Sequence, residues 1–164
     1  LAIPLIPFKS GAPIDYLFDG ADEFDDKLRM LKGGGGAMTR EKIAARRARR
    51  RVYLVQELKR VTRLGERSPL PVEIRESALD SARAAFLERG LECHVRAHEG
   101  GRFATDNGNP VLDVRLDARA DLEELGRWIE RLRGVVGHGL FINEADEIIV
   151  EGADGKIRRM ISKR

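Results

Sequence analysis

Four consecutive glycines at positions 33–36 interrupt the first part of the chain and restrict how it can fold. A short apolar segment, 28–32, runs directly into them, and a helical spacing of apolar residues follows from about 38 to 50. Residues 15–19 before this unit and 52–55 after it have the composition of buried strands. The alternation of strand, loop, helix and strand predicts an α/β fold built on a parallel sheet.

A different pattern follows the segment 67–71, whose two prolines mark a domain boundary. The elements predicted beyond it are strands at 72–74, 92–98, 103–105, 111–116 and 134–141, helices at 77–89 and 121–131, a hairpin turn at 106–109, and closing strands at 148–150 and 156–160. We therefore expect an α/β protein in two parts. One is a Rossmann-like parallel sheet domain, 1–70 with 147–164, and the other is a small α+β domain with an antiparallel sheet, 71–146.

The chain begins with Leu1, and its first residues already resemble the middle of an α/β unit. Residues 1–8 predict a short strand and a connection, and nothing before them supplies the first strand and helix of such a sheet. We expect that the N-terminal strands of the parallel sheet are missing because the beginning of the natural protein has been lost, removed or not recorded.

The composition, 42% hydrophobic and 35% charged, is that of a soluble globular protein. Apolar runs stay far shorter than the roughly 18 residues of a transmembrane helix, and the opening residues have no basic flank like that of a secretory signal. Cys93 is the only cysteine, which excludes an internal disulfide framework and suits a reducing compartment. We expect a cytoplasmic protein with no membrane partner.

Much of the basic excess behind the net charge of +3 lies in residues 46–51, RRARRR, with further basic residues up to Arg63. Such a cluster can bind nucleic acid through phosphate contacts. It is also typical of the solvated face of a helix whose apolar face consists of Ile43 and three following alanines. The second interpretation is favoured because arginines at the end of a helix suit its macrodipole. We do not expect nucleic acid as a partner.

Chemically reactive side chains gather between Asp19 and Glu41. Asp19, Asp22 and Glu23 lie where a predicted strand passes into a loop, the edge of an α/β sheet at which ligands bind. Lys32 comes just before the glycines, whose backbone can approach a ligand closely, and the helix N-terminus that follows favours anions. Glu41 falls in the first turn of that helix, so we expect it to face the same pocket.

Two common nucleotide-binding motifs are excluded. A Walker A loop needs lysine and then Ser or Thr after the glycines, whereas Lys32 precedes them. A dinucleotide fingerprint that starts at Gly33 needs Gly or Ala at its sixth position, which is Met38. Each acidic residue taken alone fits a solvated loop, and Glu41 fits a helix start. Three carboxylates, a lysine and a glycine loop within 23 residues together favour a site.

Six blocks resemble, in order and approximate spacing, those of the ribose-5-phosphate isomerase A family. They are DGADE at 19–23, LKGGGGA at 31–37, TREKI at 39–43, PLPVE at 69–73, TDNGN at 105–109 and GVVGHGLF at 134–141. The resemblance covers essentially the whole chain. It implies an aldose–ketose isomerase of the non-oxidative pentose phosphate pathway, which interconverts ribose 5-phosphate and ribulose 5-phosphate through an enediolate without a metal or organic cofactor.

The resemblance also implies roles for individual residues. Glu41 matches the general base, which takes the proton from C2 and returns it to C1. Asp19 and Asp22 match the acidic pair that contacts the sugar hydroxyls, and Lys32 matches the lysine that stabilises the developing oxyanion. Lys59 matches a lysine that helps to hold the phosphate. The implied substrate-binding set also includes Gly20, Gly33, Gly34 and Gly35.

The sequence departs from the family pattern in two places. The Gly-Thr-Gly-Ser-Thr loop with which the family grips the phosphate, and a later serine-rich loop, do not occur in it. Before Lys59, where the family has an Asp-x-Ser-Lys-like run, an acidic and a hydroxyl position are replaced by Gln56 and Leu58. The alternative is therefore a non-catalytic, truncated relative that acts as an interaction module through its basic helix.

The histidines do not predict a metal site. His94 and His98 on one strand would lie on the same face but about 13 Å apart, too far to share a metal ion. His138, between two glycines, is expected in a turn, and the segment 106–109 taken alone is a hairpin turn rather than a site. Because members of the family are dimers or tetramers, the resemblance implies a homodimer or homotetramer assembled through the small domain, with a sugar phosphate as small-molecule partner.

Overall fold

The computed structural model describes residues 4, 11 and 13–162. The strand and connection predicted at 1–8 therefore lie outside the described residues, apart from Pro4. In chain order the elements are β1 (Ile14–Asp19), β2 (Glu23–Phe24), β3 (Met30–Leu31), α1 (Met38–Arg47), β4 (Ala48–Gln56), the 3₁₀ turn η2 (Glu57–Lys59), β5 (Leu70–Ile74), the 3₁₀ turn η3 (Glu76–Ala78), α2 (Leu79–Glu88), β6 (Cys93–Val95), β7 (Ala97–His98), β8 (Gly101–Arg102), β9 (Val111–Val114), α3 (Leu122–Arg131), β10 (Val135–His138), β11 (Leu140–Phe141), β12 (Glu147–Glu151) and β13 (Ile157–Ile161).

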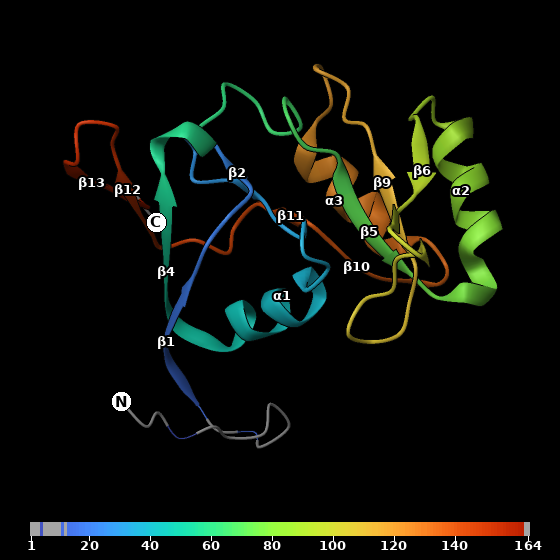
Figure 1. The fold of residues 1–164 in the computed structure, drawn as a ribbon, viewed down its shortest axis with the longest axis horizontal. Coiled ribbons are helices and arrows are strands. Elements are labelled where there is room, and N and C mark those ends of the chain that lie inside the picture. The colour runs from blue at the N-terminus through green and yellow to red at the C-terminus, as the bar shows by residue number, and fades with distance from the viewer. Residues whose placement is uncertain (1–3, 5–10, 12, 163–164) are drawn as a thin grey trace.

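A four-stranded sheet with the strand order β1-β4-β12-β13 forms one side of the molecule (Figure 1). The central strand β4 is parallel to β1, with Asp19 opposite Tyr53, and also parallel to β12, while β13 is antiparallel to β12. Helix α1 lies on the connection from β1 to β4, as a parallel crossover requires. The predicted α/β fold with a Rossmann-like parallel sheet is confirmed.

A second sheet, antiparallel and ordered β10-β5-β9-β6, forms the other side together with α2 and α3 (Figure 1). Between the two sheets, β11, β3 and β2 make a small antiparallel sheet. The predicted α+β part with its antiparallel sheet is therefore confirmed. The domain boundaries at residues 70 and 147 stay a prediction.

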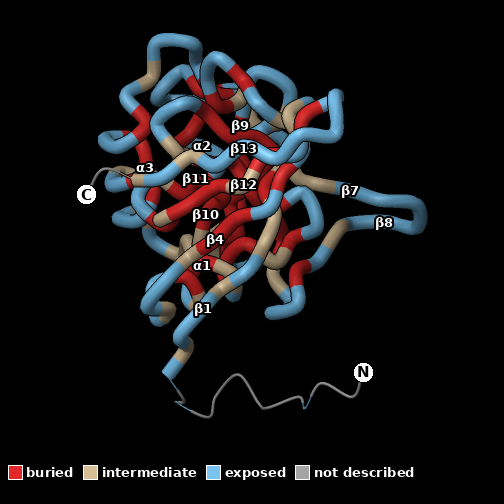
Figure 2. Tube along the Cα trace, turned by 90° about the vertical axis from the view of Figure 1, so that its left-hand side faces the viewer, coloured by how far each residue is buried: buried red, intermediate tan, exposed pale blue. Residues whose placement is uncertain are grey.

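Each of the two larger sheets has its own hydrophobic core. Phe86 of α2, Ile129 of α3 and Ile74 of β5 are fully buried in one core, and Met38 of α1 packs with Tyr53 of β4 in the other. Burial of each such side chain stabilises the fold by about 1.5–3 kcal/mol. Figure 2 shows the buried strands β11 and β12 and the exposed ribbon β7–β8. Among the residues that the structure describes, no helix combines the length and apolar composition needed to cross a membrane.

The helix after the glycines is shorter than predicted. It ends at Arg47, and Ala48 has an extended backbone and lies opposite Ile14 as the first residue of β4. Pairing with β1 satisfies the backbone of residues 48–50 in a sheet and outweighs their helical pattern. The predicted apolar face is only partly right, because Ala45 is buried but Ile43 is 44% exposed. The face that α1 buries consists of Met38, Thr39, Lys42 and Ala45.

The basic run 46–51 is consequently not one face of a helix. Its second half lies on β4, where successive side chains point to opposite faces of the sheet. Arg50 lies 2.8 Å from Glu147, and Arg51 lies 2.6 Å from Asp146. These ion pairs compensate the positive charge that the sequence concentrates in this segment.

The strand predicted at 92–98 is interrupted. Its first half pairs with β9 as β6, and its second half pairs with β8 in a separate two-stranded ribbon. The ribbon turns at Gly100 and Gly101, whose φ angles of +104° and +141° favour glycine. The chain therefore leaves the sheet at Arg96, because this turn pairs β7 with β8 instead of extending β6.

The turn predicted at 106–109 forms, but the strand predicted at 103–105 does not. The backbone N–H of Gly108 donates to the Thr105 carbonyl at 2.8 Å, and that of Thr105 donates to the Asn109 carbonyl at 2.9 Å. The loop folds over a side chain of β5 instead of continuing a ladder, as described below. His138, predicted in a turn, is a buried residue of β10 because it pairs with Val72 of β5.

Candidate active site

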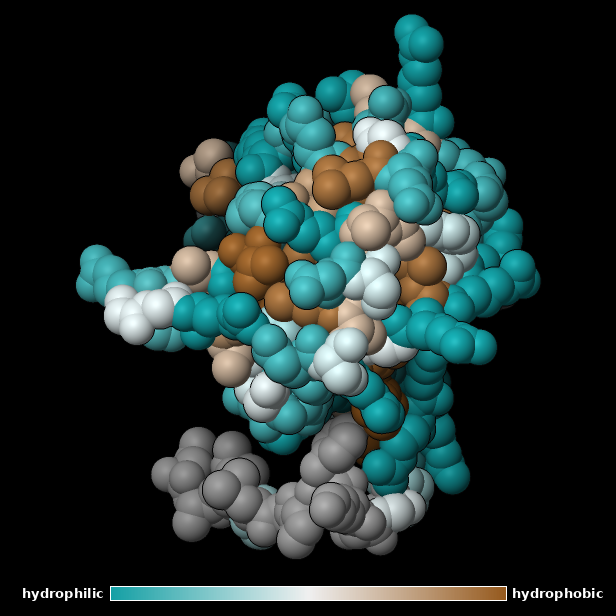
Figure 3. Space-filling view, turned by 90° about the vertical axis from the view of Figure 1, so that its right-hand side faces the viewer, coloured by the Kyte–Doolittle hydropathy of each residue, from teal (hydrophilic) through white to brown (hydrophobic). Residues whose placement is uncertain are grey.

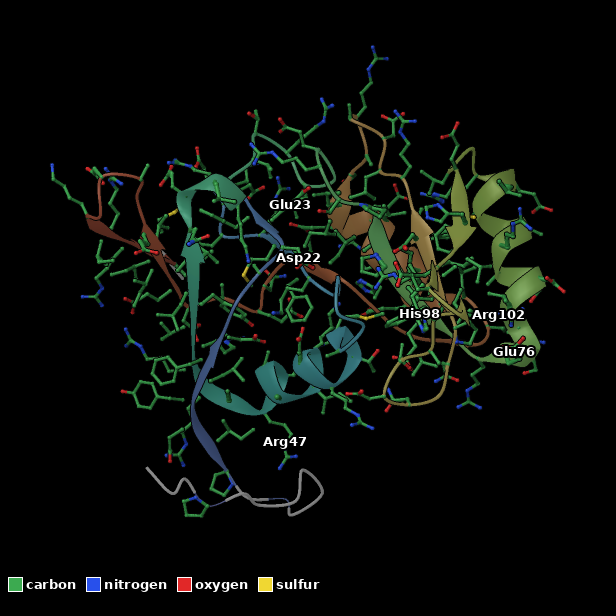
Figure 4. All side chains as sticks on the ribbon, in the orientation of Figure 1. Asp22, Glu23, Arg47, Glu76, His98 and Arg102 are labelled. Atoms are coloured by element: carbon green, nitrogen blue, oxygen red, sulfur yellow. The ribbon has the colours of Figure 1, made fainter. Side chains whose placement is uncertain are left out.

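Three segments bring the predicted polar residues together between the two sheets. Asp19 is the last residue of β1, Lys32 follows β3 directly, and Glu41 lies in the first turn of α1. Asp22 lies in the connection between β1 and β2, near the centre of the molecule (Figure 4). The site is thus at the carboxyl edge of the parallel sheet, where α/β folds bind ligands.

The Lys32 ammonium is the centre of the cluster. It is 4% exposed, and it lies 3.1 Å from Asp19 Oδ2 and 3.3 Å from Glu41 Oε2. It also donates a hydrogen bond to the carbonyl oxygen of Gly20. A buried ammonium is costly unless it is paired, and these oxygens supply the compensation.

Two aromatic rings complete the surroundings of this lysine. The ammonium lies 5.5 Å from the ring centroid of Tyr53 and 5.6 Å from that of Phe141, within cation–π range. Tyr53 comes from β4 and Phe141 from β11, so elements far apart in sequence enclose the charge. The sequence carries no signal that either ring belongs to the site.

Glu41 is a half-buried carboxylate next to this cation. Burial raises its pKa above 4.5, Lys32 opposes this shift, and the negative charges of Asp19 and Asp22 add to it. Its Oε2 atom is buried and, among the described residues, has no aligned hydrogen-bond donor, although the ammonium is near enough for an ion pair. A carboxylate with a raised pKa and an unoccupied oxygen is suited to accept a proton.

The glycine loop is folded around Asp22. The N–H of Gly34 donates to Asp22 Oδ2 at 2.7 Å, and the N–H of Gly36 donates to the Gly33 carbonyl at 3.0 Å. Gly33 has a φ of +104°, and a Cβ there would lie 2.8 Å from Pro71, so a side chain does not fit. The predicted loop therefore lies in the cluster and brings backbone amides to it.

A second glycine lets β11 approach the lysine. The N–H of Lys32 donates to the carbonyl of Gly139 at 2.9 Å, and a Cβ on Gly139 would overlap the Lys32 carbonyl oxygen. The family block at 134–141 thus contributes the backbone contact that holds Lys32 in place.

Arg96 is a site-forming residue that the sequence analysis missed. Its guanidinium donates to the carbonyls of Gly33 at 2.8 Å and Gly34 at 2.9 Å, and it forms a two-pronged pair with Asp113 at 2.9 and 2.6 Å. It also lies 5.3 Å from the ring centroid of Phe103. The sequence analysis placed Arg96 only within a predicted strand at 92–98, and that pattern carries no signal of this contact.

Two predicted residues lie elsewhere. Glu23 is buried and accepts hydrogen bonds at 2.6–2.8 Å from the backbone N–H groups of Gly65, Arg67 and Ser68. Its role is therefore to stabilise the loop 65–68. Lys59 ends the 3₁₀ turn after β4, at the same sheet edge as Asp19. Within the described part of the chain, no hydrogen bond or ion pair joins Lys59 to the cluster.

The cluster has the composition for proton transfer next to a carbonyl group. It holds a proton-accepting carboxylate, a cation and two further carboxylates that can bind hydroxyl groups. In residues 13–162, no group of three or more His, Cys, Asp or Glu side chains has the geometry to hold a metal ion.

Comparison with known proteins identifies the relatives of this chain. The sequence profile described as ribose 5-phosphate isomerase A (phosphoriboisomerase A) matches residues 1–155. The chain belongs to the ribose-5-phosphate isomerase A family. It is 44% identical over 156 residues to the ribose-5-phosphate isomerase A of Roseiflexus castenholzii, covering 94% of this chain and 67% of that protein. The isomerase of Sphingopyxis alaskensis is 40% identical over 154 residues, with the same two coverages.

Solved structures of ribose-5-phosphate isomerases have the same fold. The enzyme from Methanocaldococcus jannaschii superposes with a TM-score of 0.86 at 36% identity, covering 93% of this chain and 68% of that one. A D-ribose-5-phosphate isomerase in complex with phospho-erythronic acid superposes with a TM-score of 0.91 at 30% identity, covering 97% and 70%. The ribose-5-phosphate isomerase A fold is therefore shared by the described residues of this chain.

Proposed function

We propose that this protein interconverts ribose 5-phosphate and ribulose 5-phosphate, with Glu41 as the base. The observation that carries the proposal is the contact of Lys32 with both Asp19 and Glu41 at the carboxyl edge of the sheet. Isomerisation of an aldose to a ketose needs a base beside C2 and a positive charge beside the carbonyl oxygen. A single buried cluster supplies both.

In the forward direction, Glu41 takes the proton from C2 of the open-chain aldose. The C2–H electron pair then forms the C1–C2 double bond, and the carbonyl electrons move to O1, which gives the enediolate. Glu41 then returns its proton to C1, the C2 hydroxyl proton passes to O1, and the O–H electron pair on O2 forms the C2 carbonyl, which gives the ketose. The raised pKa of Glu41 suits both halves of this transfer, since the group must hold the proton between them.

Lys32 stabilises the oxyanion that forms during these steps. Its ammonium is fixed by Asp19, Gly20 and the aromatic rings, so it needs little reorganisation as charge develops. Asp19 and Asp22 contact the sugar hydroxyls and assist ring opening. The amides of the glycine loop line the same site, and Lys59 at the sheet edge helps to hold the phosphate.

The ligand in one related structure fits this assignment. Phospho-erythronic acid, present in one superposable isomerase, is a phosphorylated sugar acid. A compound of that class carries a carboxylate and hydroxyl groups that match a lysine with neighbouring carboxylates. We therefore expect the protein to bind a sugar phosphate in the cluster around Lys32.

The direct test is an isomerase assay with Glu41→Gln as the variant. We expect ribulose 5-phosphate to form from ribose 5-phosphate, and the variant to lose on the order of 10²- to 10⁴-fold in turnover. Glutamine keeps the size and the polar contacts of the side chain but cannot accept the proton. A loss below about threefold in an active preparation would remove Glu41 from the role of base.

The alternative of a non-catalytic interaction module loses its structural basis. It required a basic helix, but α1 ends at Arg47 and the arginines on β4 are paired with acidic residues. Salt-dependent binding to nucleic acid, together with no effect of ribose 5-phosphate on thermal stability, would support that alternative.

We further propose that the protein is a cytoplasmic homodimer or homotetramer that assembles through the small domain, 71–146. On the side of the molecule that carries α2, apolar residues are scattered among hydrophilic ones rather than joined in one patch (Figure 3). Leu87 of α2 is 51% exposed and Val136 of β10 is 36% exposed, and an interface between copies would cover side chains of this kind. Light scattering coupled to size exclusion measures the state, and a monomer at micromolar concentration would refute it.

A further inference from the structure

Glu73 of β5 is a fully buried carboxylate surrounded by neutral hydrogen-bond donors. The Thr105 hydroxyl donates to it at 2.8 Å, and the side-chain amides of Asn107 and Asn109 donate at 3.0 and 2.8 Å. The Thr39 hydroxyl is the fourth donor. A buried charge needs this degree of satisfaction to be tolerated, so the arrangement is specific.

The four donors come from two different parts of the chain. Three belong to the loop 105–109, and the fourth, Thr39, is in the first turn of α1. Through Glu73, the TDNGN block is therefore joined to the TREKI block that carries the base. This explains a motif that, taken alone, predicted only a hairpin turn.

The residue next to the base is held by the same loop. The Arg40 guanidinium donates to the Asp106 carbonyl at 2.8 Å and to Asn107 Oδ1 at 3.1 Å. On the other side of Glu41, the Lys42 ammonium donates to the Leu140 carbonyl at 2.6 Å. The neighbours of Glu41 are thus fixed, while its own Oε2 atom has no aligned donor among the residues that the structure describes.

These contacts stabilise the first turn of α1 in place of a side-chain hydrogen bond from the N-cap residue. The N-cap residue of α1 is Ala37, which has no side-chain hydrogen bond to the first turn. The first turn also packs closely on β10, since a Cβ on Gly137 would overlap the Thr39 hydroxyl. The direction in which α1 presents Glu41 therefore depends on Thr39 and Arg40.

We infer that Glu73 and the loop 105–109 position the catalytic base by holding the first turn of α1. The inference rests on the proposed role of Glu41. Glu73 does not touch the reacting atoms in this scheme and acts through Thr39. Displacement of a reacting group by about 1 Å can lower turnover on the order of 10²-fold, so the link has a kinetic consequence.

The ionised state of Glu73 supports this role. Burial alone would raise its pKa, but the hydrogen bonds from Asn109, Thr39, Thr105 and Asn107 outweigh burial and hold the pKa below 4.5. The carboxylate is therefore a permanent acceptor at neutral pH. A change in activity on loss of the Thr39 hydroxyl then reports the hydrogen bond itself rather than a titration of Glu73.

The experiment compares Thr39→Val with Thr39→Ser and Arg40→Ala. Valine has the size of threonine but no donor, whereas serine keeps the hydroxyl. We expect kcat to fall about 10- to 100-fold in Thr39→Val, to fall less in Arg40→Ala, and to stay within about threefold in Thr39→Ser. The KM for ribose 5-phosphate should change by less than about threefold in all three, because Lys32 and the glycine loop are untouched.

The pH profile separates positioning from general destabilisation. The charged groups that face Glu41 are Lys32, Asp19 and Asp22, and none is altered in these variants. A loosened first turn admits water to Glu41, so the acidic limb of kcat/KM should move to lower pH in Thr39→Val. Asp121→Ala removes the side-chain cap of α3 and serves as a control that lowers stability without this shift.

Equal kcat values for Thr39→Val and Thr39→Ser would overturn the inference, as would a loss of kcat with an unmoved acidic limb. Glu41→Gln, measured in parallel, keeps the two proposals apart. If Glu41→Gln remains active, the role of Glu41 is wrong. If Glu41→Gln is inactive while Thr39→Val behaves like the unmodified protein, the role of Glu41 survives and the positioning role of Glu73 is wrong.

Discussion

The ammonium of Lys32 lies 3.3 Å from Oε2 of Glu41, where the lysine is buried and the glutamate half-buried. Their proximity lowers the pKa of Glu41, yet burial raises it more strongly, so the carboxylate keeps a raised pKa even beside a cation. A second carboxylate, Asp19, shares the same lysine at 3.1 Å and reduces the cation's effect on Glu41. Burial is thus the main cause of the raised pKa of Glu41, and the nearby negative charges of Asp19 and Asp22 add to it.

Removal of that charge should affect turnover and its pH dependence together. Lys32→Met is expected to lower kcat about 10²- to 10³-fold, because the oxyanion loses its stabilising cation. The pKa of Glu41 should rise further, so the acidic limb of kcat/KM should move to higher pH. Steady-state kinetics across pH measures both effects.

Lys59→Met is the matched control for this lysine. Lys59 lies at the same sheet edge but outside the cluster, so its loss should raise the KM for ribose 5-phosphate and leave kcat within about threefold. Equal effects of the two substitutions on kcat would contradict the different roles assigned to the two lysines.

Glu41 should stabilise the fold less when it is ionised. Its pKa in the folded protein is above 4.5, so the folded state binds this proton more tightly than the unfolded state does. Stability from this group is therefore fully present below pH 4.5 and decreases as the pH rises through the raised pKa. We expect Glu41→Gln to melt at a higher temperature than the unmodified protein at neutral pH, with the difference vanishing below about pH 4.

Scanning calorimetry at several pH values tests this expectation. Glu88→Gln, at an exposed position of α2, is the matched control and should leave the melting temperature unchanged. A Glu41→Gln variant less stable than the unmodified protein at neutral pH would show that the ion pair with Lys32 outweighs the cost of burial.

Lys42 should make the stability of the fold increase with pH in the alkaline range, the opposite of the dependence expected for Glu41. Burial lowers its pKa to about 8 from 10.5, and its ammonium lies against Leu140 and the ring of Phe141. The unfolded state binds this proton more tightly, so stability should increase as the pH rises from 8 to 10.5. Relative to Lys42→Met, the unmodified protein should gain up to about 3 kcal/mol over this range, measured by urea unfolding. An unchanged difference between the two proteins would contradict the lowered pKa.

Gly139 should not tolerate a side chain. A Cβ there would overlap the Lys32 carbonyl and lie 2.8 Å from Pro71, and both neighbours are part of buried structure. Gly139→Ala is expected to cost about 1–3 kcal/mol or more in unfolding free energy and to lower activity by displacing Lys32. Circular dichroism melts and the isomerase assay measure the two effects.

Gly126→Ala provides the contrast. Gly126 is in the middle of α3, and a Cβ there would lie 3.7 Å from His138, an ordinary contact. Alanine favours the helix by up to about 1 kcal/mol, so this variant should be as stable as the unmodified protein or more stable. Destabilisation of the same size in both variants would refute the packing argument for Gly139.

Local pattern was sufficient where neighbouring residues decide the structure. The glycine run fixed a loop before α1, and the spacing at 121–131 predicted a helix that the structure places at Leu122–Arg131 with Asp121 as its cap. The same pattern failed at residues 48–50, where pairing with β1 draws the chain into a strand. Helical spacing is a property of neighbours in sequence, whereas a parallel ladder is decided by a distant segment.

The sequence by itself determined the family and the general order of the main helices and strands, and it singled out Asp19, Asp22, Lys32 and Glu41 as the candidate reactive set. Tertiary structure alone decided what surrounds them. Arg96, which follows β6 and pairs with Asp113 of β9, holds the glycine loop, and Glu73 holds the helix that carries Glu41. Each contact joins residues more than thirty positions apart in the sequence. Burial and hydrogen bonding set the pKa of a side chain, and both depend on residues that only the folded chain brings together.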